Sequence, residues 1–157
     1  MSLDAAQFRQ TMGQLVTGVS VVTVRTAEGG LGMTASAVVS LSLIPPLLLV
    51  CVGNEAAIHD ALLKSERFGV NVLAAQQDGL ARRFADRERQ QLAEAELELS
   101  PGGVPILGGA LARIECQHRG HFSAGDHSIV TGTLEWSDIG EGWPLCYFRG
   151  AYAELGE

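Results

Sequence analysis

The sequence predicts a mainly β fold, a closed antiparallel barrel with a few helices at its periphery. Many short segments rich in Val, Ile, Leu and aromatic residues are separated by turns that contain Gly or Pro, a pattern typical of strands. Few segments carry apolar residues at helical spacing. Numerous short strands with few long helices favour a barrel. Because neither a repeat nor a linker interrupts the chain, we expect a single domain over residues 1–157.

The first element is expected to be an amphipathic helix over residues 4–17. Apolar residues recur at helical spacing from Phe8 to Val16, and Asp4 is a candidate N-cap. A short β-branched run, residues 19–24, follows as a strand.

The next strands form a hairpin and its continuation. A turn at 28–30 joins the first strand to a second over 33–42, which is rich in small side chains. The Pro45-Pro46 turn then leads into an aliphatic strand over 47–52. The remaining expected elements are helices at 56–64, 76–84 and 87–97, a loop at 101–105, and strands at 68–73, 110–121, 128–136 and 145–148.

Composition excludes several classes of function. A net charge of −7 and an isoelectric point near 5.0 argue against nucleic-acid binding, which depends on Lys and Arg. No apolar run approaches the roughly 20 residues of a membrane-spanning helix, and no secretory leader is visible. The cysteines Cys51, Cys116 and Cys146 are odd in number and widely spaced, so we expect reduced thiols in the cytoplasm.

The strand over 33–42 is the first candidate site. Strand alternation would place Thr34, Ser36, Ser40 and Ser42 on one face. That face is either a solvated side of a half-exposed sheet or a surface on which a large flat ligand approaches the backbone. Backbone donors beside small residues suit the N5, O4 and N3 atoms of an isoalloxazine ring, which favours the second interpretation.

A second candidate is Gly125-Asp126-His127, a turn between two expected strands. It is either an ordinary turn with an exposed His or a place where an imidazole stabilises a negatively charged ligand.

Other chemistries find weaker support. His118 and His121 lie near Cys116, but no partner completes a metal site at the usual spacing, so no metal is predicted. The glycines at 29–32 lead into a strand, which is unlike a dinucleotide-binding loop, and no nucleophile-elbow motif is present for a serine hydrolase.

Motifs along nearly the whole chain resemble the flavin reductase-like family, the short-chain NAD(P)H:flavin oxidoreductases that serve two-component monooxygenases. In order, they are Phe8-Arg9-x-x-Met12-Gly13, Thr17-Gly18-Val19-x-Val21-Val22-Thr23, Gly32-Met33-Thr34-Ala35-Ser36, Ser40-x-Ser42-x-x-Pro45-Pro46, Phe68-x-Val70-Asn71-Val72-Leu73, Phe84-Ala85, Gly125-Asp126-His127 and Tyr147-Phe148-x-Gly150-x-Tyr152. The chain departs from the family at Ile44, and at residues 86–91, where a short charged run replaces a longer loop.

The resemblance implies an FMN-binding split barrel that forms a homodimer and binds FMN or FAD. NADH or NADPH would be the electron donor, and a separate monooxygenase would receive reduced flavin. The implied flavin contacts are Gly32, Met33, Thr34, Ala35, Ser36, Ser40, Ser42, Cys51, Val52, Asn54, Ala56 and Phe84. The implied nicotinamide contacts are Met12, Gly13, Gly125, Asp126 and His127.

The expected reaction is hydride transfer from the nicotinamide to flavin N5, for which no nucleophile or general base is needed. Backbone amides around Thr34–Ser36 would stabilise the anionic reduced flavin, and His127 would assist as an electrostatic partner or proton donor. The alternative is a flavin carrier or electron-transfer protein without reductase activity, since split-barrel relatives also bind haem or pyridoxal phosphate derivatives.

Overall fold

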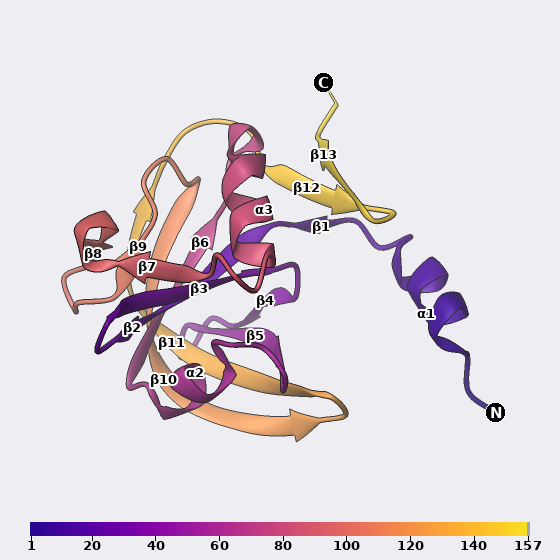
Figure 1. Cartoon of the computed structure of the whole chain (residues 1–157), viewed down its shortest axis with the longest axis horizontal. Coiled ribbons are helices and arrows are strands. Elements are labelled where there is room, and N and C mark those ends of the chain that lie inside the picture. The colour runs from indigo at the N-terminus through magenta and orange to yellow at the C-terminus, as the bar shows by residue number, and fades with distance from the viewer. Residues whose placement is uncertain (157) are drawn as a thin grey trace.

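The computed structural model describes residues 1–156, which form an eight-stranded sheet, a three-stranded sheet and a two-stranded ribbon. Short helices lie at the periphery (Figure 1), so the predicted mainly β fold class is confirmed. In chain order the elements are α1 (Ala5–Met12), β1 (Thr17–Gly18), β2 (Ser20–Thr26), β3 (Gly29–Ala35), β4 (Val38–Ser42), β5 (Leu47–Gly53), α2 (His59–Lys64), β6 (Arg67–Val72), η1 (Ala75–Gln77), α3 (Asp78–Ala85), β7 (Gln91–Ala93), η2 (Glu94–Glu96), β8 (Glu98–Leu99), β9 (Pro105–Ile106), β10 (Ala112–Ala124), β11 (His127–Ile139), β12 (Leu145–Phe148) and β13 (Ala151–Glu154).

The large sheet curls back on itself. Its strands pair in the order β4-β5-β11-β10-β6-β2-β3-β7. β3 leads through Ser36 and Ala37 directly into β4, although these strands lie near opposite ends of that order. The two ends of the sheet must therefore approach each other, and β3 also contacts β5. The candidate site opens at this approach.

β2 is buried on both faces because the sheet carries a core on each side. Val22 and Val24 belong to the cluster enclosed by the curled sheet. Val19, which precedes the strand, and Val21 pack outward under α3, in a cluster that includes Phe84. Each fully buried valine contributes about 1.5–3 kcal/mol of transfer free energy. This second cluster fixes α3, and α3 forms one wall of the site.

Most predicted strands are found close to their expected bounds, namely β2, β5, β6, β10, β11 and β12. The expected helix at 76–84 corresponds to η1 and α3, and the one at 56–64 begins only at His59, in α2. The sequence reasoning missed β1, β8, β9 and β13.

The single strand predicted over 33–42 is wrong, because β3 ends at Ala35 and β4 begins at Val38. The side chain of Ala35 is buried, whereas Ser36 is exposed in the bend. The Thr34 hydroxyl donates a hydrogen bond to the carbonyl of Ala81, 2.7 Å away. The break interrupts the alternation expected over residues 33–42.

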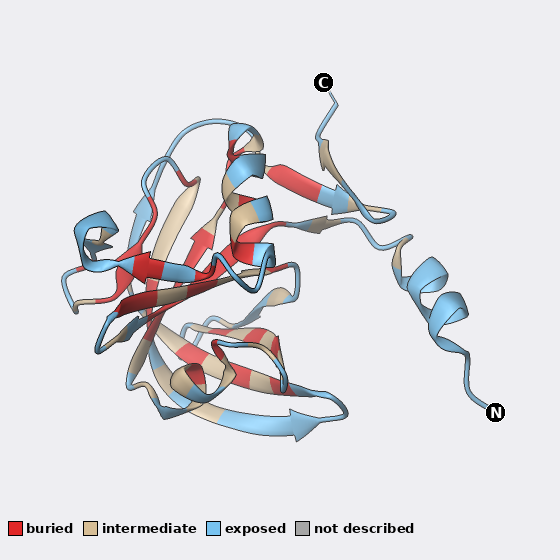
Figure 2. Ribbon diagram, viewed as in Figure 1, coloured by how far each residue is buried: buried red, intermediate tan, exposed pale blue. Residues whose placement is uncertain are grey.

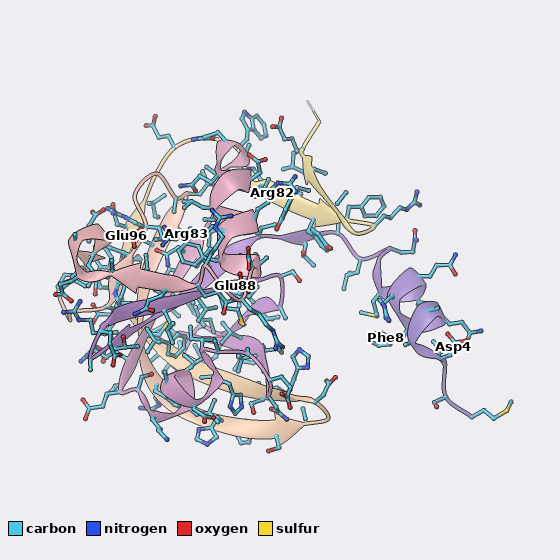
Figure 3. All side chains as sticks on the ribbon, in the orientation of Figure 1. Asp4, Phe8, Arg82, Arg83, Glu88 and Glu96 are labelled. Atoms are coloured by element: carbon cyan, nitrogen blue, oxygen red, sulfur yellow. The ribbon has the colours of Figure 1, made fainter. Side chains whose placement is uncertain are left out.

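The helix predicted over 87–97 is also wrong. Residues 91–93 instead pair with β3 as β7, and Leu92 is buried beside Gly30. Arg83 of α3 donates to the carbonyl oxygens of Arg89 and Gln91 and forms an ion pair with Glu96. Figure 3 shows Arg83 and Glu96 on the same side of the molecule. These tertiary contacts outweigh the local helical spacing.

The N-terminal helix is shorter than the predicted 4–17, since α1 ends at Met12. Its predicted N-cap is confirmed: Asp4 accepts a hydrogen bond from the Gln7 N–H, and Gln7 reciprocates. The helix stands away from the body of the chain (Figure 1), and it is exposed along its length (Figure 2). Its predicted apolar face therefore covers none of the chain's own core.

Candidate functional site

A cleft of about 380 Å³ opens where the ends of the curled sheet approach each other. β3, the turn after β5, the end of α3 with the loop that follows it, and the turn between β10 and β11 each contribute to its wall. The lining residues are Met33, Thr34, Gly53, Asn54, Glu55, Ala56, Phe84, Ala85, Arg87, Gln90, Asp126 and His127.

The floor of the cleft is apolar. Phe84 is fully buried, and its ring packs on the backbone of Gly32 in β3. A Cβ at Gly32 would lie only 2.7 Å from the Phe84 ring, so glycine is required for this close approach. Met33 and Ala56 extend the apolar surface beside the ring. Such a floor, with polar groups at its rim, is the usual composition of a small-molecule site.

His127 lies at the rim with a defined hydrogen bond. Its Nδ1 is 2.7 Å from an Oδ1 of Asp126, and the hydrogen bond from His127 lowers the pKa of Asp126. The preceding Gly125 has φ +61°, which confirms the predicted turn. Since a carboxylate only accepts hydrogen bonds, Nδ1 carries a proton, and Nε2 is left above Gly53.

The turn that carries His127 is tied to the turn after β5. The Asn54 N–H donates to the carbonyl oxygen of Asp126, at 2.9 Å, and β11 pairs with β5 from His127 opposite Gly53 onward. The two polar edges of the cleft therefore keep a fixed separation.

The loop after α3 closes the opposite wall. Gln90 is buried and donates to the carbonyl of Phe84, at 2.9 Å, while its backbone carbonyl accepts from the Gly32 N–H. Arg87 lines the cleft from the same loop. The charged run after Ala85 is therefore folded against the site through hydrogen bonds to β3 and α3.

A second hollow adjoins the cleft, and a third adjoins the second. One of about 230 Å³ shares Thr34 and Ala85 with it, and is also bounded by Tyr147 and Tyr152. The other, of about 700 Å³, lies against α1 and shares Ser36 and Tyr147 with the 230 Å³ hollow. The three together extend from the His127 rim to the N-terminal helix.

The structure brings part of the predicted residue set together. Of the expected flavin contacts, the cleft is lined by Met33, Thr34, Asn54, Ala56 and Phe84, with Asp126 and His127 from the nicotinamide set. Gly32 supports the floor from behind. The sequence reasoning missed Gly53, Glu55, Ala85, Arg87 and Gln90; the last two fall in the charged run that it had singled out as a departure.

Other predicted residues lie elsewhere. Ser36 lines the two adjoining hollows, and Met12 and Gly13 line only the hollow beside α1. Val52 and Ala35 are buried in the inner core, and Cys51 is half-buried on β5. Ser40 and Ser42 are on β4, outside the cleft. Gly125 shapes the turn without lining the cleft.

Cys116, His118 and His121 do not form a metal site. Nδ1 of His121 is 3.3 Å from Nε2 of His118, but burial raises the pKa of Cys116 to about 12, which keeps it a neutral thiol. Within residues 1–156 no group of three candidate ligands is placed to hold a metal ion. Over the same residues, no helix has the length and apolarity needed to cross a membrane.

Comparison with known proteins finds a matching family model and similar proteins. Residues 12–156 match the family model described as flavin reductase like domain. The chain is 38% identical over 152 residues to an NADH-dependent FMN reductase, SmoA, of Agrobacterium fabrum, covering 97% of this chain and 87% of that protein. It is 36% identical to HsaB of Rhodococcus jostii, the reductase subunit of a flavin-dependent monooxygenase, covering 98% of this chain and 80% of that one.

A solved structure agrees over the whole fold. It is the NADH:FAD oxidoreductase SgcE6 of Streptomyces globisporus in complex with NAD and FAD fragments. The TM-score is 0.90 at 35% identity, and the alignment covers 99% of this chain and 98% of that one.

Proposed function

Since the chain belongs to the flavin reductase like family, we propose that it is an oxidoreductase that reduces FMN or FAD with NADH, and that the cleft beside His127 is where it does so. One observation carries the assignment of the site. The cleft joins an apolar floor at Phe84 to a rim on which Asp126 orients His127. A flavin, when bound, supplies the N5 atom that accepts hydride.

The residues of the cleft fit a flavin ring. The volume of the cleft, together with that of the hollow sharing Thr34 and Ala85, lies in the range of small-molecule sites, about 300–1,000 Å³. Met33 and Ala56, backed by the buried ring of Phe84, offer an apolar surface to one side of a flat ring. Gly53, without a side chain, leaves room for a ligand edge between the ring floor and His127.

His127 is proposed to stabilise the negative charge that develops on reduced flavin. Asp126 holds the Nδ1 proton, so Nε2 is the atom that can gain or release a proton on the cleft side. When Nε2 gains a proton, the resulting imidazolium places a positive charge at the rim. Arg87 adds a second cation on the opposite wall.

We further propose that reduced flavin leaves for a separate monooxygenase. The support is that HsaB is named as the reductase subunit of such a system, and 98% of this chain aligns with HsaB. A cytoplasmic location is proposed on the free state of Cys51, Cys116 and Cys146, since thiols persist in reducing compartments.

A homodimer is proposed on the exposed apolar surface around α1 and β4. Phe8, Met12 and Val16 on or after α1, and Leu43 and Ile44 after the edge strand β4, are each about half exposed or more. Large apolar groups that cover no core of their own chain are typical of an interface. A second copy over this surface would enclose the 700 Å³ hollow, in keeping with the homodimer that the resemblance implies. In sedimentation experiments we expect the wild type to be a dimer and Ile44→Glu to form a weaker dimer.

The reaction is tested by steady-state oxidation of NADH and of NADPH with FMN, FAD and riboflavin in turn. We expect NADH oxidation that depends on added or bound flavin. Flavin binding without NADH oxidation would instead indicate a flavin carrier, and a protein that does neither would refute both functions. In His127→Gln we expect slower turnover with flavin binding retained; unchanged turnover would remove His127 from the mechanism.

A further inference from the structure

A chain of hydrogen bonds runs from the surface of α2 to the wall of the cleft. Asp60, an exposed carboxylate, lies 2.9 Å from Nδ1 of His59. Nε2 of His59 is 2.9 Å from Oγ of Ser128 on β11, and that hydroxyl is 3.1 Å from Oδ1 of Asn54. Ser128 is buried, with 4% of its surface exposed, and only Asn54 of the four lines the cleft.

The protons of this series of hydrogen bonds can be arranged in two ways. The Asp60 carboxylate accepts only, so Nδ1 of His59 keeps its proton in both. When His59 is an imidazolium, Nε2–H donates to Ser128, and the single hydroxyl proton of Ser128 must go to Oδ1 of Asn54. The amide nitrogen of Asn54 then remains free to donate into the cleft.

When His59 is neutral, the hydrogen bonds reverse. The Ser128 hydroxyl donates to the bare Nε2, and its oxygen can then accept but no longer donate toward Asn54. The Asn54 side chain satisfies it by turning its NH₂ group to Ser128, which leaves the carbonyl oxygen at the cleft. The heavy atoms keep their places, because the two ends of an amide are nearly the same size.

We propose that His59 and Ser128 are positioning residues that set which end of the Asn54 amide faces the bound flavin, according to the protonation of His59. The consequence for flavin rests on the proposed function, whereas the switch itself is a property of the protein alone. With His59 charged, Asn54 presents a donor to the cleft, which would suit an anionic group of the bound flavin nucleotide. With His59 neutral, it presents an acceptor, which would repel an anion.

Several charged groups surround the switch. From α2, Asp60 contacts the imidazole directly, and Lys64 acts on Asp60. From β11, Ser128 makes the contact, while the adjacent His127 is turned to Asp126. Because His127 is a second imidazole that lines the cleft, a test must separate the two histidines. Ser128→Ala does so, since it removes the hydroxyl that links His59 to Asn54 and leaves both histidines in place.

The switch is tested first without flavin, by following the side-chain NH₂ signals of Asn54 in ¹⁵N-labelled protein from about pH 5 to pH 8. The signals are assigned by their absence in Asn54→Asp. We expect them to move as His59 loses its proton in the wild type, and not to move in Ser128→Ala. The control is Thr131→Val, which removes another hydroxyl of β11, bonded to the carbonyl of Gly120, and keeps the response.

Two results would overturn the proposal: Asn54 signals that do not respond to pH in the wild type, or a response that survives in Ser128→Ala. His59→Gln, which cannot titrate, provides a second variant should Ser128→Ala fold poorly, and it too should abolish the response. A purely structural role for Ser128 would lower stability and leave the pH response of Asn54 unchanged.

FAD is the probe for the functional consequence. FMN is avoided because its phosphate monoester itself titrates at about pH 6, which would mix with the effect of His59. We expect the Kd for FAD to rise about fivefold as His59 becomes neutral, which is the effect of losing one hydrogen bond. This rise in Kd should be absent in Ser128→Ala and present in Thr131→Val. Tighter binding as pH rises would overturn the donor assignment. A protein that does not bind FAD at any pH would refute the proposed function, while the NMR result would still decide the switch.

Discussion

Gly32→Ala tests whether the cleft floor depends on close contact between β3 and the Phe84 ring. A methyl group at residue 32 would lie 2.7 and 2.8 Å from two ring carbons of Phe84 and 3.2 Å from Cγ1 of Val21. Real Cβ atoms essentially never come this close to a neighbour. Phe84 is fully buried, so its ring cannot turn out into solvent to relieve the contact.

The cost follows from forced movement in a packed core. Inserting one methyl group where neighbours cannot yield destabilises by about 1–3 kcal/mol. For a chain of this length, about 2 kcal/mol lowers Tm by about 4–8 °C. Displacement of Phe84 also raises the floor of the cleft, so flavin affinity should fall together with stability.

The assay is thermal unfolding of matched variants, with flavin binding measured on each. Gly79→Ala is the control, because it lies on α3, the helix of Phe84, and an added Cβ there meets nothing within 4 Å. Alanine in place of an exposed helical glycine should stabilise by up to about 1 kcal/mol. Opposite signs for the two variants support the packing argument. A Gly32→Ala protein as stable as the wild type, with unchanged flavin affinity, would refute it.

Three further predictions concern the loop, the thiols and the rim. Arg83→Met removes the donor that holds the loop after α3, so we expect faster proteolysis within residues 86–96 and a higher KM for flavin, measured by limited digestion and steady-state kinetics. The Cys116 thiol, whose pKa burial raises to about 12, should resist alkylation at pH 8 in the folded protein and react only after unfolding, as mass mapping would show. Because the hydrogen bond from His127 lowers the pKa of Asp126, that contact adds stability above the ordinary pKa of Asp and loses it as the pH falls through the lowered value. In His127→Gln an NMR titration should find the Asp126 pKa moved up toward its ordinary range.

Much of the fold could be predicted because strand signals are local. The β-branched, aliphatic and aromatic runs that became β2, β5 and β12 carry enough apolar residues to identify them without knowledge of their partners. The turn at Gly125 was likewise predictable, since the Gly-Asp pair specifies it locally.

The failures arose where a distant contact decides the conformation. The strand break after Ala35 depends on the sheet curling back, and nothing within residues 33–42 signals it. The run around Leu92 has helical spacing, yet pairing with β3 and the hydrogen bonds from Arg83 hold it extended. Arg87 and Gln90 therefore reach the cleft by a route that periodicity could not indicate.

The candidate site shows the same division. Thr34, Asn54, Phe84 and His127, far apart in sequence, line one cleft, and the resemblance had singled out each of them. The chain from His59 through Ser128 could not be anticipated from sequence, because it joins α2 to β11 across the sheet.

The central claim, that flavin is reduced in the cleft beside His127, is tested most directly by the rate of flavin reduction by NADH in a single turnover without oxygen. Glu55→Trp would fill the cleft, and the control Gln117→Trp places the same side chain in a separate hollow beside His118. We predict that reduction is lost in Glu55→Trp and retained in Gln117→Trp, with both variants folded. Wild-type reduction rates in Glu55→Trp would contradict the claim and place the chemistry elsewhere on the chain.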